Sequence, residues 1–214
     1  MPKRFFNKIL FCEKCLLCGK PLKSNPFLCE VCLFSLKPFP EEDQITLPFL
    51  DGYKTFTHYG WREKEWVSFI KFGGFKSLAH FAGNLAKPFL EGYIKDKKPD
   101  WVTYIPTNPW RLWFSRGFDP VEEMVKGANL KVEKILRRRW RIRKPLARIK
   151  NIEERKRLVK NIFSIEKRFK ARLRGKRILV IDDLLSSGAT ASEVAKLLKA
   201  IGVKEVYLFA FFRA

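Results

Sequence analysis

The C-terminal part of the chain has the clearest pattern of apolar and polar positions. Residues 178–181 (Ile-Leu-Val-Ile) are all apolar and β-favouring, which is typical of a strand buried on both faces of a parallel sheet. Apolar residues then recur at helical spacing from Val194 to Ile201, and Gly202 predicts the end of that helix. Residues 203–212 predict the next strand. The order strand, loop, helix, strand is the unit of a parallel α/β sheet.

Weaker periodicities predict elements earlier in the chain. Partial alternation indicates a strand over residues 51–59, and the spacing of large apolar residues indicates a helix over residues 60–72. Recurrence every 3.6 residues predicts a second helix around residues 78–89. Residues 101–105 form a short apolar strand that Pro106 stops, and a helix from Pro120 is expected to run to about Asn129. We therefore predict an α/β fold: a parallel sheet flanked by helices.

All five cysteines fall within the first 32 residues. Four of them form two C-x-x-C pairs separated by ten residues: Cys15 and Cys18, then Cys29 and Cys32. Two such turns supply the four thiolates of a closed, structural Zn²⁺ site. Cys12 with Cys15 is a competing first pair, but Gly19 suits a knuckle turn after Cys18. A redox pair or unrelated buried thiols are the alternatives. Because so short a segment cannot build its own core, the metal would supply its folding energy.

The sequence also indicates a domain boundary and a cellular location. Pro38, Pro40 and the acidic residues 41–43 predict a linker, so we expect a knuckle with its linker over residues 1–40 and a second domain over residues 41–214. No run of about 18 apolar residues is present, and the N-terminal stretch lacks a signal-peptide core. We therefore expect a cytoplasmic chain without membrane insertion.

The charge of the chain indicates a polyanionic partner. The 214 residues carry 44 Lys and Arg against 22 Asp and Glu, a net charge of +22, while 46% of residues are hydrophobic. A disordered basic tail would be poorer in apolar residues, so the chain is folded and cationic. Residues 131–177 hold 21 Lys and Arg and four acids, a net +17. A solvated basic face is the simpler interpretation of this stretch.

Nucleic-acid binding is the functional interpretation of the same basic stretch. Arg137–Arg139 and Arg155–Arg157 would follow the phosphate backbone of single-stranded DNA. Trp140 and Phe169 offer rings on which bases can stack, although core packing is the more common fate of such residues.

The loop after the 178–181 strand has the most specific chemistry. Two acids, Asp182 and Asp183, are followed by small residues from Ser186 to Thr190 at the start of a helix. Backbone N–H groups and hydroxyls in such a loop, with the helix N-terminus, can enclose a phosphate. Carboxylates beside it can accept hydrogen bonds from ribose hydroxyls. A magnesium site of Walker-B type is the alternative, but the chain has neither a P-loop sequence nor G-x-G-x-x-G. The pattern predicts a ribose 5-phosphate site.

These residues resemble the signature of type I phosphoribosyltransferases, in which a strand, two acids and a small-residue loop bind phosphoribosyl pyrophosphate (PRPP). The resemblance implies that Asp182 and Asp183 bind the ribose hydroxyls, and that Mg²⁺ accompanies PRPP. The 5-phosphate would lie on Ser186, Ser187, Gly188, Ala189 and Thr190. Pyrophosphate donors are expected from the loop that faces the acids, where Thr107 and Arg116 fit best; Lys71 and Arg111 are weaker candidates.

The chain also resembles the ComF (competence protein F) family over nearly its whole length. The matching segments are the cysteine knuckle, Tyr59-Gly60, Ile70–Gly74, Ile105–Pro109, Arg116–Phe118, and Arg155, Asn161 and Phe163 before the PRPP strand. The resemblance implies PRPP binding, a role in natural competence, the handling of imported single-stranded DNA, and contact with other competence proteins. The alternative is an active phosphoribosyltransferase of nucleotide metabolism with an unknown nitrogen acceptor and no DNA role.

Two segments depart from the ComF pattern. The family commonly continues Arg-Gly-Phe with Asn-Gln, where this chain has Asp119-Pro120, and a Thr-x-x-Gln-like element is replaced by Arg-Lys-Pro-Leu at residues 143–146. Both changes remove an amide near the expected second-substrate region. PRPP binding is therefore better supported than transferase turnover.

Overall fold

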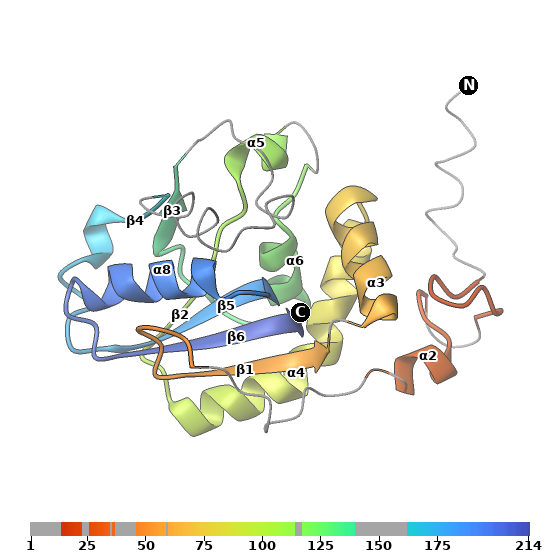
Figure 1. The fold of residues 1–214 in the computed structure, drawn as a ribbon, viewed down its shortest axis with the longest axis horizontal. Helices are drawn as coiled ribbons and strands as arrows, with labels where there is room; N and C mark the ends of the chain where they lie inside the picture. Colours follow the sequence, from red (N-terminus) through yellow and green to blue (C-terminus); the bar gives the residue numbers. More distant parts are fainter. Residues whose placement is uncertain are drawn as a thin grey trace.

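A four-stranded parallel sheet forms the centre of the protein (Figure 1). The computed structural model describes residues 14–22, 26–34, 36, 46–58, 60–113, 117–139 and 162–214, without the side chains of residues 61 and 62. The strand order is β1–β6–β5–β2, with β1 at Gly52–His58, β2 at Trp101–Tyr104, β5 at Arg177–Leu185 and β6 at Glu205–Arg213. The predicted α/β fold with a parallel sheet is confirmed.

Helices cover both faces of this sheet. The helices α3 (Trp61–Phe72), α4 (Lys76–Lys97) and α6 (Pro120–Gly127) pack on one face, and α8 (Ala189–Lys199) packs on the other. Residues of β5 alternate between the two resulting cores: Leu179 and Ile181 face α4, whereas Ile178 and Val180 face α8. Burial on both faces explains why residues 178–181 are all apolar.

Shorter elements complete the described structure. They are α2 (Glu30–Phe34), α5 (Pro109–Arg111), the 3₁₀ helix η4 (Lys167–Phe169), and an antiparallel ribbon of β3 (Leu136–Arg138) and β4 (Phe163–Ile165).

Two glycines allow α4 and α6 to pack at very short range. A Cβ atom on Gly83 would stand 1.8 Å from the Met124 carbonyl oxygen, and one on Gly127 would stand 1.8 Å from that of His80. Any larger residue would force the helices apart, so these positions require glycine. The close packing fixes α6, whose N-terminus lies beside the functional loops described below.

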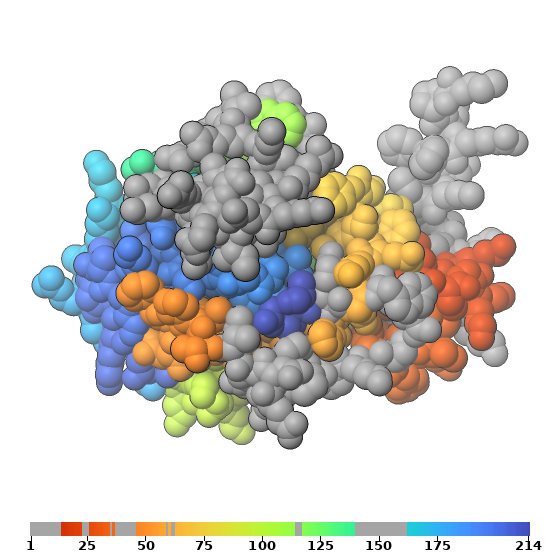
Figure 2. All heavy atoms as spheres, in the orientation of Figure 1, coloured from red at the N-terminus to blue at the C-terminus, as the bar shows by residue number. Residues whose placement is uncertain are grey.

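The cysteine knuckle packs onto the α3–α4 face of the sheet. Cys15 and Cys32 are buried in the same apolar core as Trp66 of α3, and the rings of Phe27 and Phe81 lie 5.4 Å apart. Figure 2 shows the knuckle at one end of the molecule, next to α3. The domain division at residue 40 stays a prediction.

Two expectations need correction. Strand β5 does not end before Asp182 but continues through both acids to Leu185, because Leu184 and Leu185 pair with the end of β6. Phe169 is not available for base stacking: it is buried, with its ring 5.7 Å from that of Trp101. Trp140 and Arg155–Arg157 lie outside the described residues. Within the described part of the chain, none of the helices is long and apolar enough to cross a membrane.

Candidate functional site

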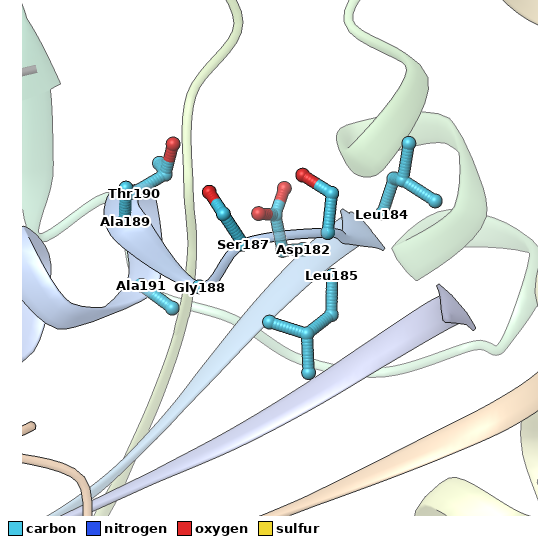
Figure 3. A pocket seen from close by; sticks show the side chains of 9 residues that line it. Asp182, Leu184, Leu185, Ser187, Gly188, Ala189, Thr190 and Ala191 are labelled. Carbon is cyan, nitrogen blue, oxygen red and sulfur yellow. The ribbon is translucent and has the colours of Figure 1, made fainter. Parts of the chain in front are cut away.

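The loop from β5 to α8 encloses a small hollow at the carboxyl end of the sheet. The hollow measures about 80 Å³. This is several times the volume that a single water molecule needs, so the hollow has room for a phosphate group. Figure 3 shows the carboxylate of Asp182 and the hydroxyls of Ser187 and Thr190 pointing to the same side of the loop. The lining residues are Asp182, Leu184, Leu185, Ser186, Ser187, Gly188, Ala189, Thr190 and Ala191. The structure thus brings Asp182 and the predicted loop residues Ser186–Thr190 to one hollow, whereas Asp183 is not among its lining residues.

Gly188 gives this loop its sharp turn into α8. Its φ of +70° is a left-handed conformation that residues with a Cβ adopt at a cost, and a Cβ there would stand 2.2 Å from Leu47 Cδ2. As the N-cap of α8, Gly188 also offers no side-chain acceptor to the first-turn N–H groups. An anion is the natural partner for these N–H groups and for the positive end of the helix dipole.

Arg213, at the end of β6, binds the first residues of the same loop through hydrogen bonds. Its Nη1 donates to the carbonyl oxygens of Leu185, at 3.1 Å, and Ser186, at 2.8 Å. These carbonyls are thereby turned toward Arg213. Sequence reasoning missed Arg213, since its contact with the loop depends on the pairing of β5 with β6.

Different contacts hold the two acids at the end of β5. The Asp182 carboxylate accepts a hydrogen bond from the backbone N–H of Asp183 at 2.8 Å. Burial, and then the charge of Asp183, hold the pKa of Asp182 well above its usual range. Because the pKa of Asp182 depends on its surroundings, a ligand that brings hydroxyls or positive charge would favour the ionised form of this acid.

Lys71, at the end of α3, forms an ion pair with the second acid. Its Nζ lies 2.7 Å from Asp183 Oδ2, and the two side chains are only 17% and 15% exposed. The sequence offered Lys71 as a weaker pyrophosphate candidate, and the structure shows it against the expected ribose-binding carboxylate. This ion pair fixes the orientation of the Asp183 carboxylate.

Asp119 connects the expected pyrophosphate loop to α6. Its Oδ2 accepts a hydrogen bond from the backbone N–H of Thr107 at 2.7 Å, and its Oδ1 caps α6 by accepting from Val121 N–H at 3.0 Å. Burial, together with the nearby charge of Asp183, raises the pKa of Asp119 to about 6, although the N–H donors act in the opposite direction. The Asp-Pro pair therefore caps the helix as Asn would. Arg116, the other pyrophosphate candidate, lies outside the described residues.

The four predicted metal ligands converge in the knuckle. The sulfur atoms of Cys15, Cys18, Cys29 and Cys32 all lie within 4.8 Å of one another. Tetrahedral Zn²⁺ with Zn–S bonds of 2.3 Å would place its sulfurs about 3.8 Å apart, so this donor set fits a zinc ion after small adjustments. Gly19 turns at a φ of +71°, as the knuckle requires, and its N–H donates to the Cys15 carbonyl at 2.9 Å. Cys12 lies outside the described residues.

Comparisons with known proteins agree with this arrangement. A family model for the phosphoribosyl transferase domain matches residues 133–214, which include β5, the phosphate loop and α8. The chain is 27% identical to the competence protein ComFC of Streptococcus pneumoniae, in an alignment that covers 94% of this chain and 100% of that protein. The resemblance to ComF proteins is thereby confirmed.

Three solved structures also match part of the chain. An allosteric regulatory enzyme of purine biosynthesis matches with 18% identity and a TM-score of 0.37, over 62% of this chain and 26% of that one. A hypoxanthine phosphoribosyltransferase from Staphylococcus aureus matches with 12% identity and a TM-score of 0.36, over 63% and 64%. A purine phosphoribosyltransferase from Pyrococcus horikoshii matches with 16% identity and a TM-score of 0.34, over 60% and 80%. The chain thus spans about a quarter of the first of these proteins and just under two thirds of the second.

Proposed function

We propose that this ComF-like protein binds PRPP at the β5–α8 loop. The observation that carries the proposal is the hollow of about 80 Å³, in which hydroxyls and a helix N-terminus meet Asp182, with Asp183 next to it on the same strand. The loop from Ser186 to Thr190 would hold the 5-phosphate, and Asp182 and Asp183 would accept hydrogen bonds from the ribose hydroxyls. An acid pair next to a phosphate cradle suits a ligand that carries both groups.

The pyrophosphate of PRPP would lie toward the loop after β2. That loop begins beside Asp182, because the Ile105 N–H donates to the Ile181 carbonyl at 2.9 Å. Thr107, held by Asp119, and Arg116 are the proposed donors. Mg²⁺ would enter with the ligand and neutralise the pyrophosphate and ribose oxygens. The protein's own part is to position the ligand and to balance its charge.

We propose Zn²⁺ as the ion of the cysteine knuckle. All four ligand positions are thiolates, which leaves none for a substrate and assigns the metal a structural role. Since Cys15 and Cys32 are part of the core that contains Trp66 of α3, the metal would also stabilise the helix that carries Lys71.

Natural competence is the proposed biological role, with single-stranded DNA handled in the cytoplasm alongside other competence proteins. The name of the pneumococcal relative supports it. So do exposed groups near the sheet end: Arg137 and Arg139 are exposed on the ribbon, and Trp113 after α5 is 74% exposed. Arginines suit the phosphates of a single strand and an exposed indole suits its bases.

Calorimetric titration with PRPP and Mg²⁺ tests the proposed ligand. We expect Asp182→Ala and Asp183→Ala each to weaken binding by roughly 1.5–3 kcal/mol, the range for a hydrogen bond to a charged group. Asp96→Ala removes an equal charge from the exposed end of α4 and is the control, with no expected effect. Unchanged affinity in the double alanine variant would exclude the site.

The alternative, an active phosphoribosyltransferase with an unknown nitrogen acceptor and no DNA role, uses the same site. Pyrophosphate release from PRPP with a panel of bases and amines would identify it. Binding without release under all these conditions would favour a protein that uses PRPP as a bound ligand.

A further inference from the structure

The middle arginine of the ribbon, Arg138, lies at the functional end of the sheet. The segment before it runs alongside β2: Glu133 N–H donates to the Val102 carbonyl at 2.9 Å, and Ile135 N–H to Thr103 Oγ1 at 3.4 Å. Arg138 Nη1 then reaches the Pro106 carbonyl at 3.4 Å. This contact places the guanidinium at the start of the loop expected to hold pyrophosphate.

The register of the sheet brings this guanidinium close to the acids of β5. Tyr104 of β2 pairs with Ile181 of β5. Pro106, two residues after Tyr104, therefore lies just past the level of Asp182, which is one residue after Ile181. Arg138 interacts electrostatically first with Asp182 and more weakly with Asp119 and Asp183, and it is repelled by Arg111. Asp182 thus has the largest electrostatic effect on Arg138 among the charged groups near it.

Arg138 differs in its surroundings from the arginines on either side. Side chains alternate along a strand, and Arg137 and Arg139 are exposed, with Arg137 paired to Glu166. Arg138 is half-buried, with its guanidinium 5.4 Å from the centre of the Phe163 ring. Burial lowers the pKa of Arg138, so the fold keeps a cation where water is partly excluded. A partly buried cation at the start of the loop after β2, where the carboxyl ends of the strands meet, favours a functional role.

We propose that Arg138 binds the pyrophosphate group of PRPP, and this inference rests on the PRPP site proposed above. The planar fork of Arg suits two phosphate oxygens at once, and its position by Pro106 lies across the acid pair from the 5-phosphate loop. Because Asp119 engages the Thr107 N–H, Thr107 would have to donate to pyrophosphate through its hydroxyl, and a further side-chain donor is favoured on this side. The basic stretch is thereby divided: Arg138 serves the small ligand, and Arg137 and Arg139 face solvent.

Three single variants with the same charge change test this assignment: Arg138→Gln, Arg137→Gln and Arg139→Gln. Each is titrated calorimetrically with PRPP and Mg²⁺, with inorganic pyrophosphate and Mg²⁺, and with ribose 5-phosphate. We expect Arg138→Gln to weaken PRPP and pyrophosphate binding about ten- to hundredfold, as the loss of a charged hydrogen bond would. Ribose 5-phosphate binding should change less than about twofold in this variant, which also shows that the site is folded. The two flanking variants should change all three affinities less than about twofold, since exposed charges contribute little.

The possible outcomes separate this inference from the proposed function. Equal losses in all three variants would show a general effect of net charge, and an unchanged pyrophosphate affinity in Arg138→Gln would overturn the assignment. If the unmodified protein binds pyrophosphate through Arg138 but does not bind PRPP, the assignment of Arg138 to pyrophosphate stands and the PRPP site is wrong. If it binds neither ligand, both proposals are wrong. Arg138→Lys should restore part of the lost affinity, since it keeps the charge without the fork.

Discussion

The ion pair between Lys71 and Asp183 should couple α3 energetically to the PRPP strand. With 2.7 Å between Nζ and Oδ2, Coulomb attraction at an effective dielectric constant of 20 is about 6 kcal/mol. Desolvation of the two charges offsets much of this attraction. The side chains of Lys71 and Asp183 are still 17% and 15% exposed, so solvent screening weakens the attraction further. We therefore expect a net coupling free energy of about 2–3 kcal/mol.

A double-mutant cycle measures this coupling directly. The free energy of unfolding is determined by urea denaturation for the unmodified protein, Lys71→Met, Asp183→Asn and the double variant. Each single variant leaves a mostly buried charge without its partner, so the double variant should be more stable than the sum of the two losses predicts.

The matched control is the pair Lys87 and Glu91 on α4. It has the same charges at i and i+4, but its atoms are 3.8 Å apart and its side chains are 37% and 62% exposed. Its coupling should stay near 0.3–0.5 kcal/mol. A Lys71–Asp183 coupling no larger than that of the control would refute the view that this pair is a structural part of the site.

Three further predictions concern the other features. Cys29→Ser should release zinc, seen by metal analysis, whereas Cys12→Ser should retain it; a protein purified without chelator and without zinc would contradict the knuckle assignment. For Asp119, a pKa raised from 3.8 to about 6 means that its stabilising contribution is present below pH 4 and lost as pH rises through 6, by roughly 3 kcal/mol. The stability of the unmodified protein relative to Asp119→Asn should fall accordingly between pH 4 and 7 in denaturation experiments, and a pH-independent difference would show that Asp119 is ionised throughout. Replacing Arg137 and Arg139 by Gln should reduce the salt slope of single-strand binding by about 1.4, or 0.7 for each lost phosphate contact, and an unchanged slope would place DNA elsewhere.

The strand, the loop and the helix around Asp182 were predictable because their signals are local. An apolar run, two acids and a glycine before a helical pattern lie within a few residues of one another, and each has a specific backbone requirement. The four cysteines were predictable for the same reason, since two C-x-x-C turns have few alternatives in so short a segment.

The partners of the acids were not predictable in the same way. Lys71, Asp119 and Arg138 come from three separate segments, and only the packing of α3 and α6 and the register of β2 with β5 bring them together. In a chain with 44 Lys and Arg, no sequence pattern distinguishes a half-buried arginine from its exposed neighbours. The end of β5 was placed too early because Leu184 and Leu185 read as loop residues until their pairing with β6 is known.

The most direct test of the PRPP site is a crystal structure of the protein with PRPP and Mg²⁺. We expect density for the 5-phosphate on the backbone N–H groups and hydroxyls of Ser186–Thr190, with ribose hydroxyls within hydrogen-bond distance of Asp182 and Asp183. Density for PRPP at another surface, or an empty β5–α8 loop under conditions in which calorimetry shows binding, would contradict the proposed PRPP site.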